Sequence, residues 1–237
     1  MLLYMQEYDR MIWYNNDIQF MFHNNILEYD MNAASLSLSE RFKLLPKETI
    51  ERLKRLDKKN RVIQTGLIRR DNKEFSVEVD KKLIYVRNEF IQENGILPND
   101  LISLHSDAVI FASKKKIKDK IDGIQFKESN RSTGYMNYKK LEMFYNNDYI
   151  TYKGASQQLL QQHTMGINKY LIKIFKYIED YDPRVLKYMS RFQKQYLQDQ
   201  FPDFMYTKFG GIGDFKFGNL DLFGFVAKVV VKEMGGW

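Results

Sequence analysis

Two largely apolar stretches, each with an aspartate in its interior, stand out in the pattern of hydrophobic and polar positions. Residues 26–38 (ILEYDMNAASLSL) begin with an apolar run that ends at Asp30 and continue with small residues. Residues 100–112 (DLISLHSDAVIFA) place Asp107 between two apolar runs. Each pattern predicts a buried strand that carries its carboxylate to a strand end, and in the first stretch a helix follows. Two such carboxylates on adjacent strands can hold a pair of divalent metal ions for phosphoryl transfer.

The stretches around these strands predict short helices and hairpins. Residues 1–22 contain a turn signal at Asn15, which indicates a hairpin, or a helix and then a strand, covering the Asp30 strand. Residues 46–60 have a capping pattern and a regular apolar spacing, which predicts a short helix with an exposed basic face. The strand-like segments 62–68 and 75–79 flank a polar turn and predict a hairpin.

After residue 80, both helices and strands are expected up to Ser156, and helices alone follow. A helix is expected over residues 82–93, ended by Gly95. A hairpin at Asp122 is expected before a strand over residues 124–127. From Ser156 onward the pattern predicts helices, which begin in the glutamine-rich residues 157–162 and continue over residues 167–178 and 184–200. The tail, residues 201–237, is rich in glycine and phenylalanine, and its glycine spacing does not fit a dinucleotide-binding motif.

Several short motifs occur in an order that resembles the palm of family B DNA polymerases, most closely the protein-primed branch. The segment YDMNAASL, residues 29–36, is similar to the first catalytic motif of that family. The segment HSDAVIF, residues 105–111, resembles the third motif, with Asp107 on its second aspartate. Downstream, DGIQFKES, KKLEMFY and YITYKGAS resemble in order a lysine-glutamate strand, a K-x-Y segment and the lysine and glycine that lead into the thumb.

The resemblance implies an α+β fold and a division of the chain into functional parts. A polymerase-type palm, an antiparallel sheet with helices, would occupy residues 1–155, with a minimal fingers insertion at about 45–90. A helical thumb and the tail would occupy residues 156–237. By the same comparison, Asp30 and Asp107 are catalytic and bind two Mg²⁺ or Mn²⁺ ions, and Met31 contributes its backbone carbonyl as a third ligand.

The resemblance also implies a nucleotide site that departs from the family. The position of the family's bulky tyrosine, which blocks a ribose 2′-OH, is Ser35 here, or Ser37 if the register slips. Either serine leaves room for the hydroxyl, so we expect ribonucleotides to be accepted unless another side chain such as Phe42 fills the space. The family's fingers helix, K-x-x-x-N-S-x-Y-G, holds the triphosphate through its lysine and asparagine, and that form is absent here. The nearest candidates are Lys58, Lys59, Asn60 and Arg61.

Basic and aromatic residues around and after Asp107 are typical of nucleic-acid binding, although a hydrated loop or a packed core explains the same composition. His105 stands where the family usually has another acid, and either contacts a primer phosphate or simply packs. Tyr145 and Lys153 match family positions. The predicted nucleic-acid-binding residues are His105, Lys114, Lys115, Lys116, Tyr145 and Lys153.

Composition limits the remaining choices. The 237 residues, 44% of them hydrophobic, suffice for one sizeable domain, or for a core with one appended lobe. The net charge of +7 favours a polyanionic partner, although a merely soluble basic protein would show the same charge. The absence of cysteine excludes disulfides and thiolate metal sites. No apolar run approaches about 18 residues and no signal-like segment opens the chain, so we expect a cytoplasmic protein without a membrane partner.

These features together predict a DNA-directed nucleotidyltransferase of viral or mobile-element origin that acts in DNA replication. It would extend a nucleic-acid strand, on a primer-template or a single strand, from nucleoside triphosphates. The main alternative is a non-catalytic nucleic-acid-binding protein with a degenerate palm. A metal-dependent nuclease shares the two-carboxylate chemistry, but it usually has more clustered acids.

Overall fold

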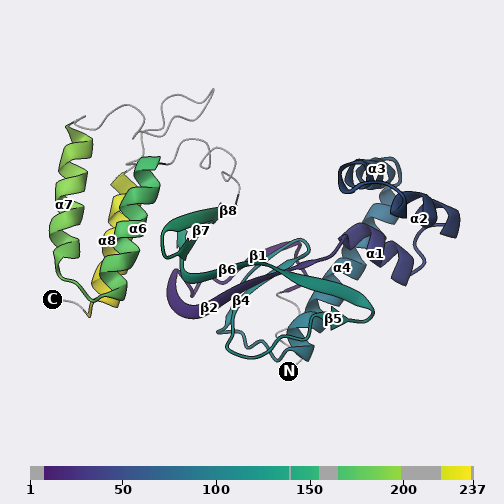
Figure 1. The fold of residues 1–237 in the computed structure, drawn as a ribbon, viewed down its shortest axis with the longest axis horizontal. Coiled ribbons are helices and arrows are strands. Elements are labelled where there is room, and N and C mark those ends of the chain that lie inside the picture. The colour runs from purple at the N-terminus through teal and green to yellow at the C-terminus, as the bar shows by residue number, and fades with distance from the viewer. Residues whose placement is uncertain (1–7, 139, 155–164, 199–219, 236–237) are drawn as a thin grey trace. The chain divides into compact units, whose positions relative to one another are not determined.

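The computed structural model describes residues 8–138, 140–154, 165–198 and 220–235 (Figure 1). These residues form an α+β fold, as the sequence predicts, with an antiparallel sheet in the strand order β1-β3-β4-β2-β6-β7-β8 and with β5 paired to β6. The strands are β1 (Ile12–Tyr14), β2 (Phe20–Met31), β3 (Leu101–His105), β4 (Ala108–Ala112), β5 (Lys120–Ile121), β6 (Ile124–Tyr138), β7 (Leu141–Asn146) and β8 (Tyr149–Lys153). The helices are α1 (Ala34–Arg41), α2 (Lys47–Lys54), α3 (Lys58–Asp71), α4 (Lys73–Glu93), α6 (Met165–Glu179), α7 (Arg184–Leu197) and α8 (Leu220–Glu233).

The chain divides into two compact units. The first unit comprises Met1–Asn15 and Leu27–Arg131, and the second comprises Asn16–Ile26 and Ser132–Trp237. Strands β2 and β6 therefore contribute residues to both units. Each unit has a hydrophobic core of its own, built around α4 in the first unit and around α6 in the second.

The core of the first unit forms where α4 packs against the strands. Val79, Leu83, Val86 and Phe90 recur at spacings of three or four residues, so they share one face of α4, and all four are buried. They belong to the same cluster as alternate residues of β2, namely Leu27 and Met31 with the half-buried Tyr29. Because successive side chains of a strand point to opposite faces, the intervening Glu28 and Asp30 lie on the other face of the sheet.

The predicted hairpin over residues 62–79 is wrong, because this segment forms α3 and the start of α4. The polar residues that indicate turns are helix caps. The side chain of Asp57 accepts a hydrogen bond from the Asn60 N–H (3.0 Å), and that of Asn72 accepts one from the Phe75 N–H (2.9 Å). Each cap satisfies a backbone N–H that the first turn of a helix leaves without a partner. Two helices therefore meet at Asn72, although the β-branched residues of this segment favour strands.

Three other predictions for the first unit are confirmed with altered boundaries. The helix expected over residues 46–60 is α2, and α3 already begins at Lys58. The helix expected over residues 82–93 is the second half of α4. The strand expected over residues 124–127 opens the much longer β6. Residues 8–22, the described part of this segment, do not form the expected hairpin, because β1 pairs with β3.

The second unit combines the β7–β8 hairpin with three helices that lie side by side (Figure 1). The helices expected over residues 167–178 and 184–200 are α6 and α7, and α8 is formed by part of the glycine- and phenylalanine-rich tail. The expected helix start at residues 157–162 lies outside the described residues. None of the described helices has the length and apolar character needed to span a bilayer.

Gly134 lies at a point of close packing in the second unit. A Cβ at this position would lie 2.8 Å from Cε1 of Phe175 and 3.2 Å from Cε1 of Phe22. The Phe175 ring is itself stacked on Tyr145, with 4.8 Å between the ring centroids, so it has little room to move. We expect Gly134→Ala to lower the free energy of unfolding by about 1–3 kcal/mol through overpacking.

Urea denaturation of the two variants Gly134→Ala and Gly66→Ala measures this effect against a matched control. Gly66 lies inside α3, and a Cβ there would have no atom within 4 Å. Gly66→Ala should therefore raise stability, by about 0.5–1 kcal/mol, through higher helix propensity. Equal stability of the two variants would contradict the packing of Gly134 against Phe175.

Candidate active site

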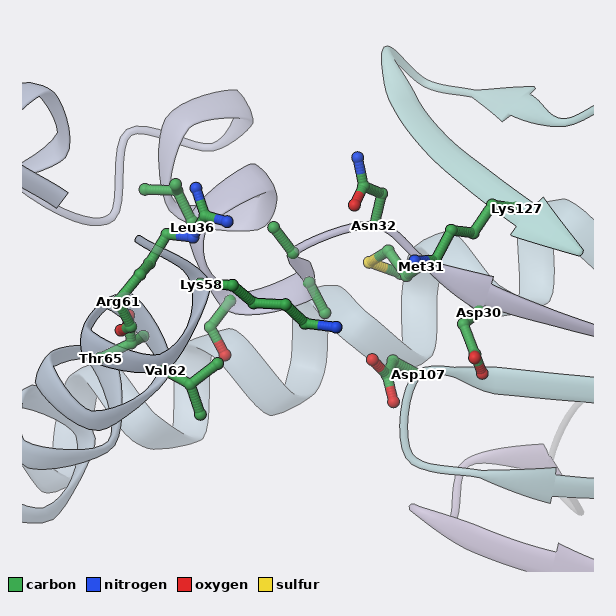
Figure 2. A pocket seen from close by; sticks show the side chains of 13 residues that line it. Asp30, Met31, Asn32, Leu36, Lys58, Arg61, Val62, Thr65, Asp107 and Lys127 are labelled. Atoms are coloured by element: carbon green, nitrogen blue, oxygen red, sulfur yellow. The ribbon is translucent and has the colours of Figure 1, made fainter. Parts of the chain in front are cut away.

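Asp30 and Asp107 lie on neighbouring strands of the first unit. Asp30 is the penultimate residue of β2, and Asp107 lies in the turn between β3 and β4. The backbone N–H of Met31 donates a hydrogen bond to the Asp107 carbonyl oxygen (3.0 Å), which joins the two segments directly. Both aspartates are half-buried and line one pocket (Figure 2). The sequence-based expectation of a strand, a turn and a helix around Asp30 is confirmed by β2 and α1.

Strand β6 brings a lysine opposite Asp30 on the other side of β2. The Asn32 N–H donates to the Gln125 carbonyl oxygen (2.8 Å), and the Ser129 hydroxyl donates to the Glu28 carbonyl oxygen (3.4 Å). This antiparallel register places Lys127 directly across from Asp30. Directly opposed side chains of antiparallel strands share a face of the sheet with Cβ atoms about 5 Å apart. Lys127 accordingly lines the same pocket (Figure 2).

The pocket has a volume of about 430 Å³. One face of α3 forms the opposite wall of the pocket. This face carries Lys58, Arg61, Val62 and Thr65, because spacings of three and four residues place side chains on the same side of a helix. Figure 2 shows the Lys58 side chain extending from α3 in the direction of Asp107. The full lining is Asp30, Met31, Asn32, Ala33, Ala34, Ser35, Leu36, Lys58, Arg61, Val62, Thr65, Asp107 and Lys127.

The charges of the pocket favour an anionic ligand. Its lining has two carboxylates and three cationic side chains, Lys58, Arg61 and Lys127. Within the described residues, none of these three cations takes part in an ion pair or a side-chain hydrogen bond. Several other cations of this unit are paired with carboxylates: Arg41 pairs with Asp122, Lys54 with Glu40 and Arg69 with Asp80. The pocket therefore holds unneutralised positive charge beside its aspartates.

The pair of carboxylates also fits a hard divalent cation. No cluster of three or more His, Asp or Glu side chains suited to a metal occurs in the described part of the chain, so Asp30 and Asp107 are the side-chain ligands that it offers here. Mg²⁺ is typically bound by one or two carboxylates together with waters and substrate phosphates. Two aspartates in a pocket that is also lined by two lysines and an arginine match the carboxylate part of that donor set.

Ser35 lines the pocket, whereas Ser37 is not part of its lining. The Ser37 hydroxyl instead donates a hydrogen bond to the Asn32 carbonyl oxygen (2.7 Å). Phe42 does not reach the pocket either, because its ring packs against Tyr85 with Lys82 over its face. Of the two serines considered from the sequence, the structure thus brings Ser35 to the two aspartates.

Two of the predicted nucleotide-binding residues and the predicted histidine lie outside the pocket. Lys59 is exposed on α3, and Asn60 donates hydrogen bonds from its backbone N–H and its side-chain Nδ2 to the cap residue Asp57. His105 ends β3, and its ring makes an edge-to-face contact with Tyr14 at 5.4 Å between centroids. Lys59, Asn60 and His105 thus have structural surroundings that explain them without a ligand.

The predicted nucleic-acid-binding residues are divided between the units. Lys114, Lys115 and Lys116 are exposed in the segment that follows β4 in the first unit. Tyr145 and Lys153 belong to the second unit. Tyr145 is only 1% exposed and stacks parallel to Phe175, and burial raises the pKa of its hydroxyl to about 12. Its ring is therefore covered by the core and is not open to a base.

The sequence-based prediction missed seven of the pocket residues. A signal for Lys127 was present, because Ile124 and Phe126 alternate with it and are buried in the core. Val62 and Thr65 have helical spacing from Lys58, which the expected hairpin obscured. The missed residues are Asn32, Ala33, Ala34, Leu36, Val62, Thr65 and Lys127.

A comparison with protein families covers almost the whole chain. Residues 3–223 match the model of a family described as bacteriophage PBS1 gene 130 protein. The chain belongs to this family. No curated protein matches the chain. In this member of the PBS1 gene 130 family, every residue that lines the pocket lies within the matched range.

Lys58→Gln and Lys127→Gln should each weaken binding of inorganic tripolyphosphate roughly tenfold, because each removes a charge-assisted contact that contributes about 1.5 kcal/mol. Isothermal titration calorimetry at constant ionic strength measures the affinity. Lys59→Gln is the matched control, since it removes the same charge from the same helix at an exposed position outside the pocket. An equal loss of affinity in all three variants would indicate a general charge effect in place of a pocket contact.

Proposed function

We propose that this protein is a nucleotidyltransferase that extends a nucleic-acid strand, with Asp30 and Asp107 at its reaction centre. The observation that carries the proposal is the hydrogen bond from the Met31 N–H to the Asp107 carbonyl oxygen. It joins the two segments that resemble the first and third motifs of family B polymerases, although they are far apart in the sequence. The two aspartates then face one pocket that also contains unpaired cations.

The arrangement of the strands supports a polymerase-type palm. The β3–β4 hairpin with Asp107 lies beside β2 with Asp30, and α4 packs against these strands. In this proposal residues 1–155 form the palm, α2 and α3 belong to the fingers insertion of residues 45–90, and residues 156–237 form the thumb. The family description names a bacteriophage gene, which agrees with a viral protein.

Helix α3 supports the assignment of the fingers. When the family pattern K-x-x-x-N-S-x-Y-G is counted from Lys58, its glycine falls on Gly66. Val62, Ile63 and Thr65 replace the asparagine, serine and tyrosine. The lysine of the pattern thus points into the pocket. Arg61 and Lys127, which also line it, would supply the polar contacts that Val62 cannot make.

The mechanism assigns a separate task to each group of pocket residues. Asp30 and Asp107, with the Met31 carbonyl, would hold two Mg²⁺ or Mn²⁺ ions. Such ions lower the pKa of a primer 3′-OH and neutralise the charge of the triphosphate and of the leaving pyrophosphate. Lys58, Arg61 and Lys127 bind phosphate oxygens and orient the substrate for in-line attack. Ser35 faces the sugar, and no protein nucleophile is needed.

The exposed lysines that follow β4 suit the backbone of a primer-template or a single strand. Lys114, Lys115 and Lys116 come directly after the strand that begins beside Asp107. Asn94 holds the end of this segment, because its side chain accepts from the Lys118 N–H (2.7 Å) and donates to the Lys118 carbonyl oxygen (3.1 Å). Cations on an anchored loop attract phosphates and release counterions without selecting a sequence.

Asp30→Ala and Asp107→Ala should each reduce Mg²⁺-dependent nucleotide incorporation roughly 10³-fold or more, since a lost metal ligand removes several kcal/mol of transition-state stabilisation. Primer-extension assays measure the rate, and circular dichroism checks the fold. Asp119→Asn, an exposed carboxylate outside the pocket, is the control. Near wild-type extension by either alanine variant would refute the catalytic assignment, and nucleic-acid binding by the wild type without any incorporation would favour the non-catalytic alternative.

The wild type should incorporate ribonucleotides and deoxyribonucleotides with similar efficiency, because the small Ser35 side chain leaves space for a 2′-OH. Ser35→Tyr should introduce a steric clash and select against ribonucleotides by about tenfold or more. Side-by-side extension with both kinds of nucleoside triphosphate gives the ratio. Ser37→Ala, which alters a serine outside the pocket, should leave this ratio unchanged. Strong rejection of ribose by the wild type, unaltered in Ser35→Tyr, would exclude an open sugar site.

A further inference from the structure

Arg87 is a fully buried arginine on α4 whose guanidinium contacts four backbone carbonyl oxygens. Its Nη1 donates to the carbonyls of Ser106 (2.9 Å) and Met11 (3.2 Å). Its Nη2 donates to those of Tyr8 (2.8 Å) and Arg10 (2.6 Å). Burial lowers the pKa of Arg87 to about 10, which leaves the group charged at neutral pH. Charge-assisted hydrogen bonds offset the cost of taking a guanidinium out of water.

These contacts act on the turn that carries Asp107. The Ser106 carbonyl belongs to the peptide group that contains the Asp107 nitrogen, so Arg87 holds the chain on one side of Asp107. The Met31 N–H holds the carbonyl on the other side. Ser106 also has a positive φ of 45°, a left-handed conformation that costs roughly 1–2 kcal/mol for a residue with a side chain. Its N–H donates to the Met11 carbonyl (2.7 Å), which adds a further support from the same N-terminal segment.

We propose that Arg87 is a positioning residue that places Asp107 beside Asp30 by holding the Ser106–Asp107 peptide group against residues 8–11. This role rests on the proposed function, since it gives Asp107 its place as a metal ligand. Arginine suits the task because its planar fork directs several N–H groups at fixed angles, whereas the ammonium of lysine is a single point charge. A strained turn that is held from both sides keeps the Asp107 carboxylate in one place before any ligand binds.

Two measurements on Arg87→Lys and Arg87→Gln test this role. Amide hydrogen exchange of residues 104–108 reports the turn directly, and electron paramagnetic resonance titration with Mn²⁺ alone reports the carboxylate pair. Val86→Ala is the matched control: Val86 is a buried neighbour on the same helix, so the variant loses stability but no hydrogen bond to the turn. All measurements are made well below the melting temperature of the least stable variant.

We expect the Ser106 amide to exchange at least tenfold faster, and Mn²⁺ to bind at least tenfold more weakly, in both Arg87 variants, with the smaller change in Arg87→Lys. Val86→Ala should leave Mn²⁺ binding unchanged, and should speed exchange at residues 104–108 no more than at the other core amides. Exchange at residues 104–108 that stays at the wild-type rate in Arg87→Lys, or that rises equally in Val86→Ala, would overturn the positioning role. If the wild type binds no Mn²⁺, the proposed metal chemistry fails, and the exchange data still decide whether Arg87 holds the turn.

Discussion

The arrangement of the first unit depends on the need to satisfy the buried guanidinium of Arg87. A charge without water must find hydrogen-bond acceptors, and the two Nη groups find them in the carbonyls of Tyr8, Arg10, Met11 and Ser106, whereas Nε has none among the described residues. The N-terminal segment and the β3–β4 turn are therefore drawn to the same point of α4. The pairing of β1 with β3 follows this attachment, since Ile12 lies opposite His105 immediately after the segment that Arg87 holds. One polar residue in an apolar core thus fixes the relation of three segments that are distant in sequence.

The alternation of side chains between the two faces of the sheet is the second constraint on the first unit. Leu27, Tyr29 and Met31 face the core around α4, so Glu28 and Asp30 must face the other side of the sheet. A shift of one residue in β2 would bury Asp30 in the core and expose the apolar residues, which specifies the register strongly. The same rule on β6 buries Ile124 and Phe126 and leaves Lys127 opposite Asp30. Asp30 and Lys127 therefore share one face of the sheet, because the packing of their apolar neighbours leaves them no other.

These two constraints explain which features could be predicted from the sequence. The strands with Asp30 and Asp107 were predictable, because their apolar runs and the turn residues that follow are local signals. Helix α3 was not predictable, because its apolar residues do not mark a buried face. Val62 and Ile63 are exposed, and only Thr65 is buried. Its two ends are set by the caps Asp57 and Asn72, residues that also favour turns. Arg87 lies four residues after Leu83 and three before Phe90, which places it on the buried face of the helix. Its acceptors could not be predicted, because only tertiary contacts with residues 8–11 and Ser106 supply them.

The division of charges in the pocket connects the fold with the chemistry. The cations and the carboxylates come from separate elements: α3 and β6 supply Lys58, Arg61 and Lys127, while β2 and the β3–β4 turn supply Asp30 and Asp107. Since none of the three cations is neutralised by a carboxylate in the described residues, each keeps its capacity to bind an anion. A bare anion would be attracted by the lysines and repelled by the aspartates, and a bare divalent cation would experience the reverse. In the proposed function a polyphosphate bound together with a divalent metal would satisfy both sets of charges at once, which neither component would do alone.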